Sequence, residues 1–303
     1  MMQIVKCSYG GWDNCLEMSN EQVKLLITLD VGPRVIFYGF VDGQNMFKNF
    51  DEQIGQTGGD EWKNYGGHRL WHAPEVAPRT YSPDNEAVSY ERDGNKIILN
   101  CPPEADNKLR KVIEIELDEN TSEVKLSHKI FNVDYWDKEF STWCLTVMAP
   151  EGRAIIPQEP YVAHGSEDGE SFEPARPLVL WQYTNMTDPR FIWGKKYIQM
   201  KEDSNYDSKQ KIGLLNKQGW AAYALKGDLF LIKHDYDVDA EYPDYNCNAE
   251  YFTMPGMLEM ETFSPLACVA PGEYLANNET WQLFKVDVSE DEADIDAKVL
   301  PLI

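Results

Sequence analysis

Basic residues are scarce in this sequence of 303 residues. Lysine and arginine together number 28, against 51 aspartates and glutamates, which gives a formal net charge of −23. Such a surface repels phosphate backbones and anionic lipid headgroups, so neither a nucleic acid nor a membrane is expected as a partner. Most of the excess acid is expected to form a solvated surface that favours solubility.

The sequence also lacks long apolar runs and paired cysteines. No segment approaches the roughly twenty apolar residues of a membrane span, and the first residues contain no apolar core of a secretion signal. The six cysteines are scattered without a CxxC pair, which argues against a zinc ribbon and a dense disulfide framework. We therefore expect a cytoplasmic protein with reduced thiols.

Motifs for nucleotides and cofactors are absent as well. The sequence contains no phosphate-binding loop, no dinucleotide-binding glycine pattern and no GxSxG nucleophile elbow. A serine, a histidine and an acid occur in any chain of this length, so a hydrolytic triad has no specific support. We expect no cofactor.

Short segments rich in β-branched and aromatic residues fill the chain, and clusters of Gly, Pro, Asn and Asp separate them. In KVIEIEL, for example, Ile113, Ile115 and Leu117 alternate with Glu114 and Glu116, as in a strand with one buried and one solvated face. This pattern predicts an all-β fold, a large antiparallel β-sandwich.

No low-complexity linker and no short repeat interrupts the pattern, so we predict one domain across residues 1–303. Convincing amphipathic helices are few. The best candidate is SEDEADIDAKVL at 289–300, where Ser289 and Glu292 have the spacing of a capping box. We expect this short helical tail to close the end of the domain.

The stretch GGHRLWHAPE at 66–75 places His68 and His72 at the spacing of the two helical ligands in a zinc peptidase. The two preceding glycines and Pro74 oppose a helix, and Arg69 stands where the catalytic glutamate of that motif belongs. In an extended chain four residues span roughly 13 Å, too far for two imidazoles to share one ion. No metal site is therefore expected within this stretch.

An extended segment instead places His68, Leu70 and His72 on one side and Arg69 and Trp71 on the other. Arginine and tryptophan on one face suit a sugar cleft, because they offer bidentate hydrogen bonding and an aromatic platform. The alternative is that Trp71 belongs to the core and Arg69 pairs with an acid such as Glu75. The residues alone leave both open.

A second constellation is MLEMETF at 257–263. Alternation places Glu259, Glu261 and Phe263 on one face of a strand. Two carboxylates on a shared face repel when both are ionised, which raises one pKa towards the range of a general base. The alternative is a solvent-facing strand edge with two ordinary surface acids.

Three further signals are weaker. Tyr242 and Asp244 in YPDYNCNAEY suit hydrogen bonding to hydroxyl groups, but the same residues are common in turns. Trp143 lies in the apolar segment STWCLTV, where a core position is the simpler interpretation. His128 in KLSHKIF is expected to be a structural histidine.

Taken in order, several segments resemble the galactose mutarotase-like family, a branch related to aldose 1-epimerases and hexose-phosphate epimerases. The resemblance covers most of residues 25–286, and it depends on the order of the segments rather than on any one motif. The matching segments are LDVGPRVIFYGFVDGQNMF, NYGGHRLWHAPE, KLSHKIFN, TWCLTVMAPEGRAIIP, KIGLLNKQGWAAY, YPDYNCNAEYF, LEMETFSPLACVAPGE and NETWQLFKV.

The resemblance implies a many-stranded β-supersandwich with a sugar-binding cleft. In the family a glutamate near the C-terminus accepts the proton of the anomeric hydroxyl, and Glu261 falls at that position, with Glu259 as the fallback. The family's histidine acid is missing, because the corresponding segment STWCLTV holds Trp143. His68 or His72 is then expected to serve as a relocated acid.

The predicted function is therefore the binding of a small sugar or a glycan end, with aldose 1-epimerase-like catalysis by Glu261 and a histidine. The alternatives are a non-catalytic carbohydrate-recognition domain and, third, a glycan hydrolase or lyase. The residues expected to contact the sugar are Arg69, Trp71, Glu75, Trp143, Tyr242, Asp244 and Glu259.

Overall fold

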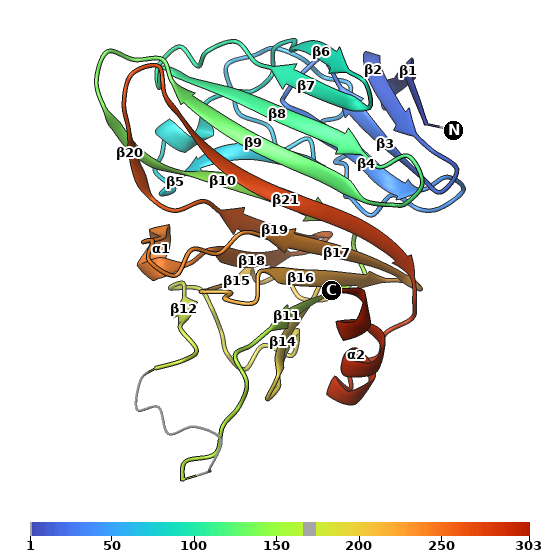
Figure 1. The fold of residues 1–303 in the computed structure, drawn as a ribbon, viewed down its shortest axis with the longest axis vertical. Coiled ribbons are helices and arrows are strands. Elements are labelled where there is room, and N and C mark those ends of the chain that lie inside the picture. Colours follow the sequence, from blue (N-terminus) through green and yellow to red (C-terminus); the bar gives the residue numbers. More distant parts are fainter. Residues whose placement is uncertain (1, 166–173) are drawn as a thin grey trace.

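Two large sheets dominate the computed structural model, which describes residues 2–165 and 174–303 (Figure 1). Neighbouring strands pair antiparallel in both sheets. The first sheet contains, in spatial order, β1 (Gln3–Tyr9), β2 (Trp12–Ser19), β3 (Val23–Thr28), β4 (Arg34–Phe40), β5 (His68–Ala73), β10 (Lys138–Met148), β19 (Met257–Phe263), β18 (Ala249–Met254), β15 (Gln210–Leu214) and β12 (Leu178–Leu180), with β20 (Ala267–Val269) paired to β10.

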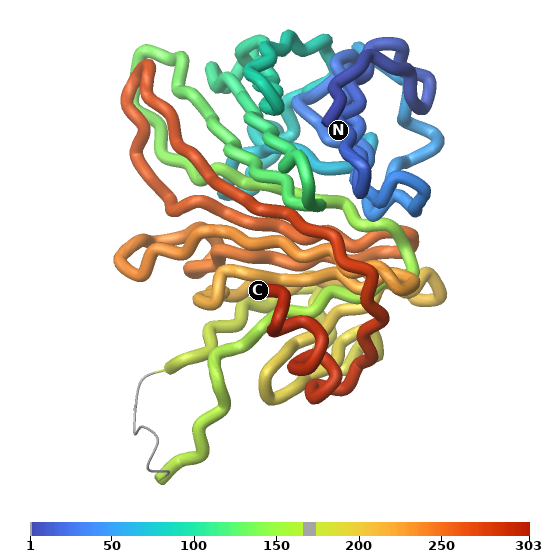
Figure 2. The backbone as a smooth tube through the Cα atoms, turned by 45° about the vertical axis from the view of Figure 1, so that its right-hand side comes forward, coloured from blue at the N-terminus to red at the C-terminus, as the bar shows by residue number. Residues whose placement is uncertain are grey.

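The second sheet brings together the middle and the end of the chain. Figure 2 shows β21, in red, running beside the green β9, with which it pairs. Its strands, in spatial order, are β13 (Phe191–Trp193), β14 (Tyr197–Lys201), β11 (Arg153–Pro157), β16 (Trp220–Leu225), β17 (Asp228–His234), β21 (Tyr274–Lys285), β9 (Val124–Asn132), β8 (Leu109–Leu117), β7 (Lys96–Asn100) and β6 (Ser89–Asp93).

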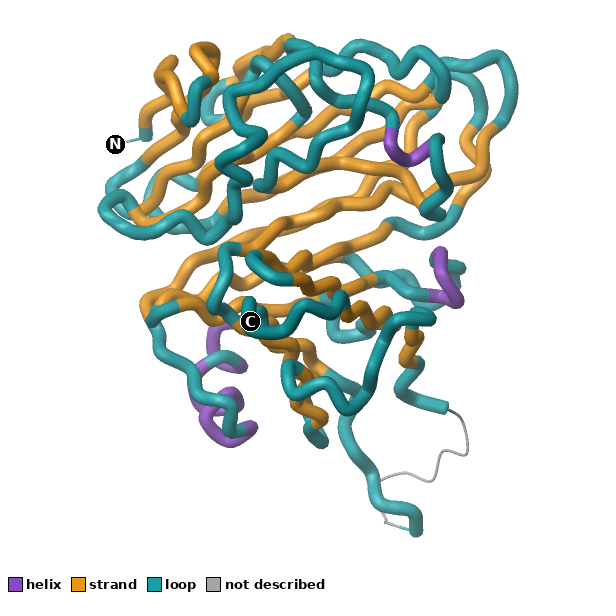
Figure 3. The backbone as a smooth tube through the Cα atoms, turned by 180° about the vertical axis from the view of Figure 1, so that it is seen from behind, coloured by secondary structure: helices purple, strands orange, loops and turns teal. Residues whose placement is uncertain are grey.

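Helices are short and lie at the periphery of the sheets (Figure 3). None of the helices in the described ranges is long and apolar enough to cross a membrane. The helical segments are η1 (Arg79–Tyr81), α1 (Pro243–Asn246), α2 (Glu292–Lys298) and η2 (Leu300–Leu302).

The predicted tail helix is confirmed as α2, but its cap differs from the expectation. Asp291 is the N-cap residue, and its carboxylate accepts a hydrogen bond from the backbone N–H of Ala293 at 2.8 Å. Glu292 instead accepts from the backbone N–H of Lys196 at 2.7 Å, so it ties the helix to the second sheet rather than completing a capping box with Ser289.

The hydrophobic core lies between the two sheets. One continuous cluster joins Leu25, Leu70 and Met260 of the first sheet with Ile113 and Leu283 of the second. The alternation in β8 is also as predicted, since its three alternating apolar residues from 113 to 117 are buried and its two glutamates are partly exposed. The prediction of a large antiparallel β-sandwich is confirmed.

Candidate functional site

A cavity of about 520 Å³ opens on the face of the first sheet that points away from this core. Its volume is within the roughly 300–1,000 Å³ of small-molecule sites. Six of the ten predicted site residues line it: Arg69, Trp71, Glu75, Trp143, Glu259 and Glu261. Another cavity, of about 340 Å³ around Asp84 and Glu104, contains none of the ten.

Strand register explains why these residues converge. Directly opposed residues of an antiparallel sheet share a face, so each row across β5, β10 and β19 points to one side. Arg69 opposes Leu145, which opposes Glu261, and this row continues to Glu250 on β18. A neighbouring row places Trp71 and Trp143 side by side. The cavity floor is therefore built by cross-strand pairing.

The alternation predicted for 66–75 is confirmed, and the structure shows which side faces the cavity. β5 is extended, with Arg69 and Trp71 lining the cavity and Leu70 in the core between the sheets. His68 and His72 lie on the side of Leu70, where both are buried. Neither histidine lines the cavity, because strand alternation turns it away from Arg69, and neither is positioned to protonate a ligand there.

Arg69 is held in a fixed orientation by an ion pair and two indole rings. Its Nη1 atom lies 2.8 Å from Oε1 of Glu259. The guanidinium carbon is 4.6 Å from the ring centroid of Trp71 and 5.5 Å from that of Trp62, within the range of a cation–π contact. The Nε atom is buried and has no hydrogen-bond partner among the described residues.

Glu261 is the most deeply set carboxylate of the cavity floor. Its Oε2 atom accepts hydrogen bonds from the indole Nε1 of Trp143 at 2.9 Å and from Nζ of Lys211 at 3.1 Å. Its Oε1 atom has no partner within the described residues. A buried acceptor without a partner costs free energy.

Lys211 on β15 holds two carboxyl groups together. Its Nζ lies 2.6 Å from Oε2 of Glu250, in addition to the contact with Glu261. Burial would lower the pKa of Lys211, but the two carboxylates outweigh burial and raise it well above its usual range. Burial raises the pKa of Glu250 well above its usual range and also raises that of Glu261. In both cases burial outweighs the charge of Lys211, which lowers the pKa. One cation between two buried carboxyl groups thus favours a proton held by the pair of carboxyl groups.

The remaining predicted residues lie at or beyond the rim. Glu75 is exposed and accepts a hydrogen bond from the hydroxyl of Tyr81. Tyr242 is buried in the apolar cluster that contains Trp71 and Trp143, and its hydroxyl accepts from the backbone N–H of Asp237 at 2.9 Å. Asp244 lies in α1 with a positive φ of 50° and does not line the cavity. The structure therefore does not bring Tyr242 and Asp244 into contact with this space.

Sequence reasoning did not identify several lining residues: Asn64, Trp62, Tyr81, Tyr183, Lys209 and Lys211. Lys211 carried a usable signal, because it directly precedes the apolar residues of IGLL and a lysine inside a buried strand needs a counter-ion. Trp62 and Asn64 come from an irregular loop before β5, and no periodic pattern marks them. Their place depends on the packing of that loop.

The burial of His72 on β5 predicts how the stability of the protein depends on pH. His72 is buried, and neither of its ring nitrogens has a partner among the described residues. Burial, followed by the charges of Lys111, Arg79 and Lys138, lowers its pKa to about 3. The unfolded chain binds a proton at this histidine below about pH 6.5 while the folded chain does not, so stability falls as the pH falls from about 6.5 to 3.

Replacing His72 with phenylalanine is expected to remove the one proton that the unfolded chain binds at this position and the folded chain does not. Urea unfolding at several pH values should then show a pH slope that is shallower by about 1.4 kcal/mol per unit between roughly pH 6 and 4. An unchanged slope in the variant would contradict the prediction. The change in unfolding free energy with pH is measured for each protein relative to its own value at pH 7, so a difference in overall stability between the two proteins does not affect the result.

The fold and the cavity together define a two-sheet β-sandwich with a small-molecule cavity on one sheet. No family model matches the sequence, and no curated protein matches it. Solved structures do match. A galactose mutarotase-like protein from Lactobacillus casei is 9% identical with a TM-score of 0.59, covering 89% of this chain and all (100%) of that one.

Two other solved structures also match this chain. A galactose mutarotase-like protein from Clostridium acetobutylicum is 11% identical with a TM-score of 0.52, covering 94% of this chain and 99% of that one. A TPR-domain containing protein from Parabacteroides distasonis is 12% identical with a TM-score of 0.60, covering 95% of this chain but 54% of that one. The chain has the galactose mutarotase-like fold, as predicted.

Proposed function

We propose that this protein binds a carbohydrate, a single sugar or the end of a glycan, in the cavity of the first sheet. One observation carries the proposal: a cluster of indole rings lies beside fixed hydrogen-bonding charges on the cavity floor. Trp71 and Trp143 contact each other edge to face, with ring centroids 5.3 Å apart. Arg69, Glu259 and Glu261 lie next to these rings in the same cavity.

This combination matches the two kinds of surface on a sugar. The C–H faces of a pyranose pack on aromatic rings, while its hydroxyl groups donate to carboxylates and accept from a guanidinium group. Arg69 Nε and Glu261 Oε1 are buried and have no partner among the described residues, so a ligand that displaced the atoms covering them would gain one donor and one acceptor. Fixed charged partners at defined positions orient the ligand as well as binding it.

The charges of the cavity favour a neutral sugar over a sugar phosphate. A phosphate dianion would enter a space with more negative than positive groups, inside a protein of net charge −23. Among the described residues, the lining supplies four carboxylates against three cations: Glu52, Glu75, Glu259 and Glu261 against Arg69, Lys209 and Lys211.

Interconversion of anomers is the second candidate, and the free Oε1 of Glu261 favours it. A carboxylate there could accept the anomeric proton while another group protonates the ring oxygen. No histidine of the described chain lines the cavity. Within the described part of the lining, the hydroxyl donors are Tyr81 and Tyr183. Burial raises the pKa of each to about 12, which makes both weak acids. Recognition without fast catalysis is therefore the preferred function.

The test is a binding titration of neutral hexoses, their phosphates and short oligosaccharides, with anomer exchange followed by NMR in the same samples. Saturable binding of a neutral sugar is expected. Glu261→Gln should weaken it about 10- to 100-fold, the loss for a hydrogen bond to a charged group. The matched control is Glu139→Gln, an exposed glutamate on β10, which should bind as the unmodified protein does.

The outcomes separate the two candidates. Exchange that is accelerated and then lost in Glu261→Gln would assign catalysis to the site. Binding without acceleration assigns recognition alone. No binding by any sugar, or binding that Glu261→Gln leaves unchanged, would overturn the proposal that the cavity is a carbohydrate site.

A further inference from the structure

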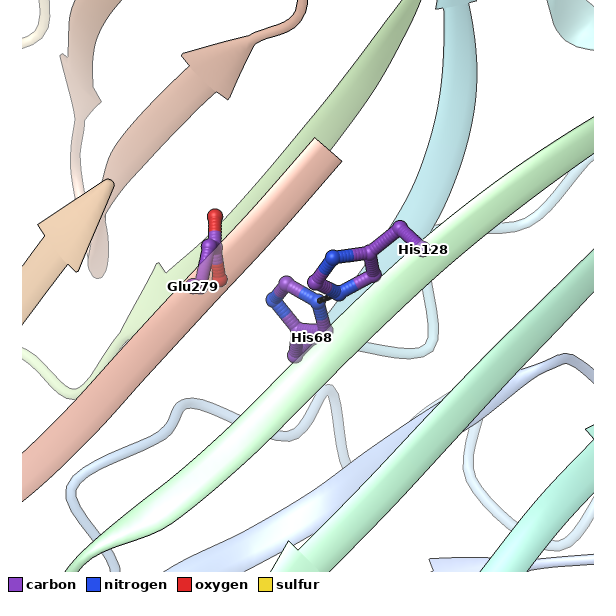
Figure 4. Close-up of side chains that lie close together, drawn as sticks. All are labelled: His68, His128 and Glu279. Carbon is purple, nitrogen blue, oxygen red and sulfur yellow. Dashed lines mark hydrogen bonds between the residues drawn. The ribbon is translucent and has the colours of Figure 1, made fainter. Parts of the chain in front are cut away.

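Three side chains that can each act as a metal ligand meet in the core between the two sheets, on the side of β5 that faces away from the cavity. They are His68 of β5, His128 of β9 and Glu279 of β21 (Figure 4). One nitrogen or oxygen from each lies within 4.8 Å of the others, and all three residues are buried. The cluster therefore joins one strand of the first sheet to two strands of the second.

Hydrogen bonds fix the direction of both imidazole rings. His128 Nδ1 lies 3.0 Å from the carbonyl oxygen of Asn277, which can only accept, so this nitrogen carries a hydrogen. His68 Nδ1 lies 2.9 Å from Oγ1 of Thr146. The two Nε2 atoms then face each other at 2.7 Å (Figure 4). The second ring nitrogens of both histidines thus point to one place.

The carboxylate is anchored in the same way. The hydroxyl of Thr262 donates to Oε1 of Glu279, and the indole Nε1 of Trp281 donates to Oε2 at 2.9 Å. Metal-binding histidines and carboxylates usually have such outer partners, which orient them and set the histidine tautomer. Here each of the three side chains has its outer partner.

We propose that His68 Nε2, His128 Nε2 and the Glu279 carboxylate form a buried site for a divalent cation of the zinc class. Two histidines and one carboxylate are a ligand set that zinc uses. Two zinc ligands at about 2.0–2.1 Å in tetrahedral geometry lie roughly 3.3 Å apart, so the Nε2 atoms would separate by about half an ångström. A bound cation would link the two sheets directly behind the proposed sugar cavity, independently of whether a sugar binds.

The alternative occupant of this position is a single proton between the two rings. In that arrangement Nε2 of His68 donates to Nε2 of His128, and Thr146 donates to Nδ1 of His68. His128 Nδ1 carries the hydrogen donated to Asn277, so Nε2 of His128 keeps a lone pair for either a proton or a metal.

Metal content of the full chain tests the proposal. Because the ligands are buried, the ion is expected to enter during folding. The chain is therefore unfolded in denaturant with a chelator, refolded with Zn²⁺ or Co²⁺, and freed of loosely held ions by a second chelator step. One equivalent of metal should remain, Co²⁺ should give visible d–d bands, and Tm should rise above that of protein refolded without metal.

Variants locate the ion. His128→Gln and Glu279→Gln should each retain less than roughly a tenth of the metal of the unmodified chain. His234→Gln, a matched change at another buried histidine, should retain one equivalent. If either ligand variant fails to fold, the Co²⁺ spectrum of the unmodified chain decides alone. Unmodified protein without retained metal and with the same Tm after either refolding would assign the cluster to a proton and overturn the proposal.

Discussion

Replacing Lys211 with methionine is expected to lower the free energy of unfolding by about 3–5 kcal/mol at pH 7. The side chain is 6% exposed and pairs with Glu250 at 2.6 Å and Glu261 at 3.1 Å. Without it, two buried carboxyl groups share one region with no ammonium group between them. Methionine keeps most of the side-chain volume, so the loss reports the charge. Urea unfolding of both proteins measures it.

Protonation should reverse part of this loss. Both carboxyl groups have raised pKa values, chiefly through burial, and removing the ammonium raises them further. The deficit of Lys211→Met is therefore expected to shrink as the pH is lowered from 7 to 5. The double variant Lys211→Met, Glu250→Gln should recover stability in the same way at pH 7.

The matched control is Lys209→Met, which removes an exposed lysine from the rim of the same cavity. A change there is expected to stay within about 0.5 kcal/mol. A Lys211→Met deficit that is identical at pH 5 and pH 7 would mean that lost packing, rather than unpaired charge, explains the effect.

Local alternation was enough to predict which residues share a face. In β19 it placed Glu259 and Glu261 together, and both line the cavity. In β5 it placed Arg69 with Trp71 and separated them from His68. Alternation has a period of two and does not show which face of the strand is buried. It therefore did not predict which face contacts a ligand. The partner sheet decides that, and its strands lie far away in the sequence.

Long-range partners account for most of what the sequence did not reveal. His68 and His128 are 60 positions apart, and Glu279 follows much later. The expectation of no metal in 66–75 considered only the neighbouring His72 as a co-ligand. In the fold, His68 instead faces a histidine from the other sheet, an arrangement that depends on the pairing of β9 with β21. Residue spacing within one segment contains no information about that contact.

The three central strands β5, β10 and β19 carry polar clusters on both faces. On the cavity side, the guanidinium of Arg69 and the ammonium of Lys211 are paired with Glu259 and Glu261. On the core side, Thr262 of β19 donates to Glu279 of the other sheet. Buried polar groups cost stability unless each is paired, so these strands are held in register by specific contacts as well as by apolar packing. The cavity floor is thereby fixed before any ligand arrives.

Replacing Asp84 with asparagine is expected to cost about 3–5 kcal/mol of unfolding free energy, because it leaves a buried arginine without its counter-ion. Arg34 on β4 is fully buried at 0% exposure. Its Nη2 atom donates to both carboxylate oxygens of Asp84, at 3.0 and 2.8 Å. Arginine keeps its charge under all ordinary conditions, so it has no means of adapting to the loss.

The same variant should also weaken ligand binding at the cavity. Arg34 Nη1 donates to the backbone carbonyls of Asn64 and Gly66, at 2.5 and 3.2 Å, and so fixes the loop that leads into β5. Asn64 lines the cavity, so a loosened loop alters its wall. Asp106→Asn, the same change at an exposed acid near Asp84, should affect neither property. Stability comes from urea unfolding and binding from sugar titration. An Asp84→Asn protein as stable as Asp106→Asn would show that Arg34 finds sufficient compensation in backbone carbonyls alone.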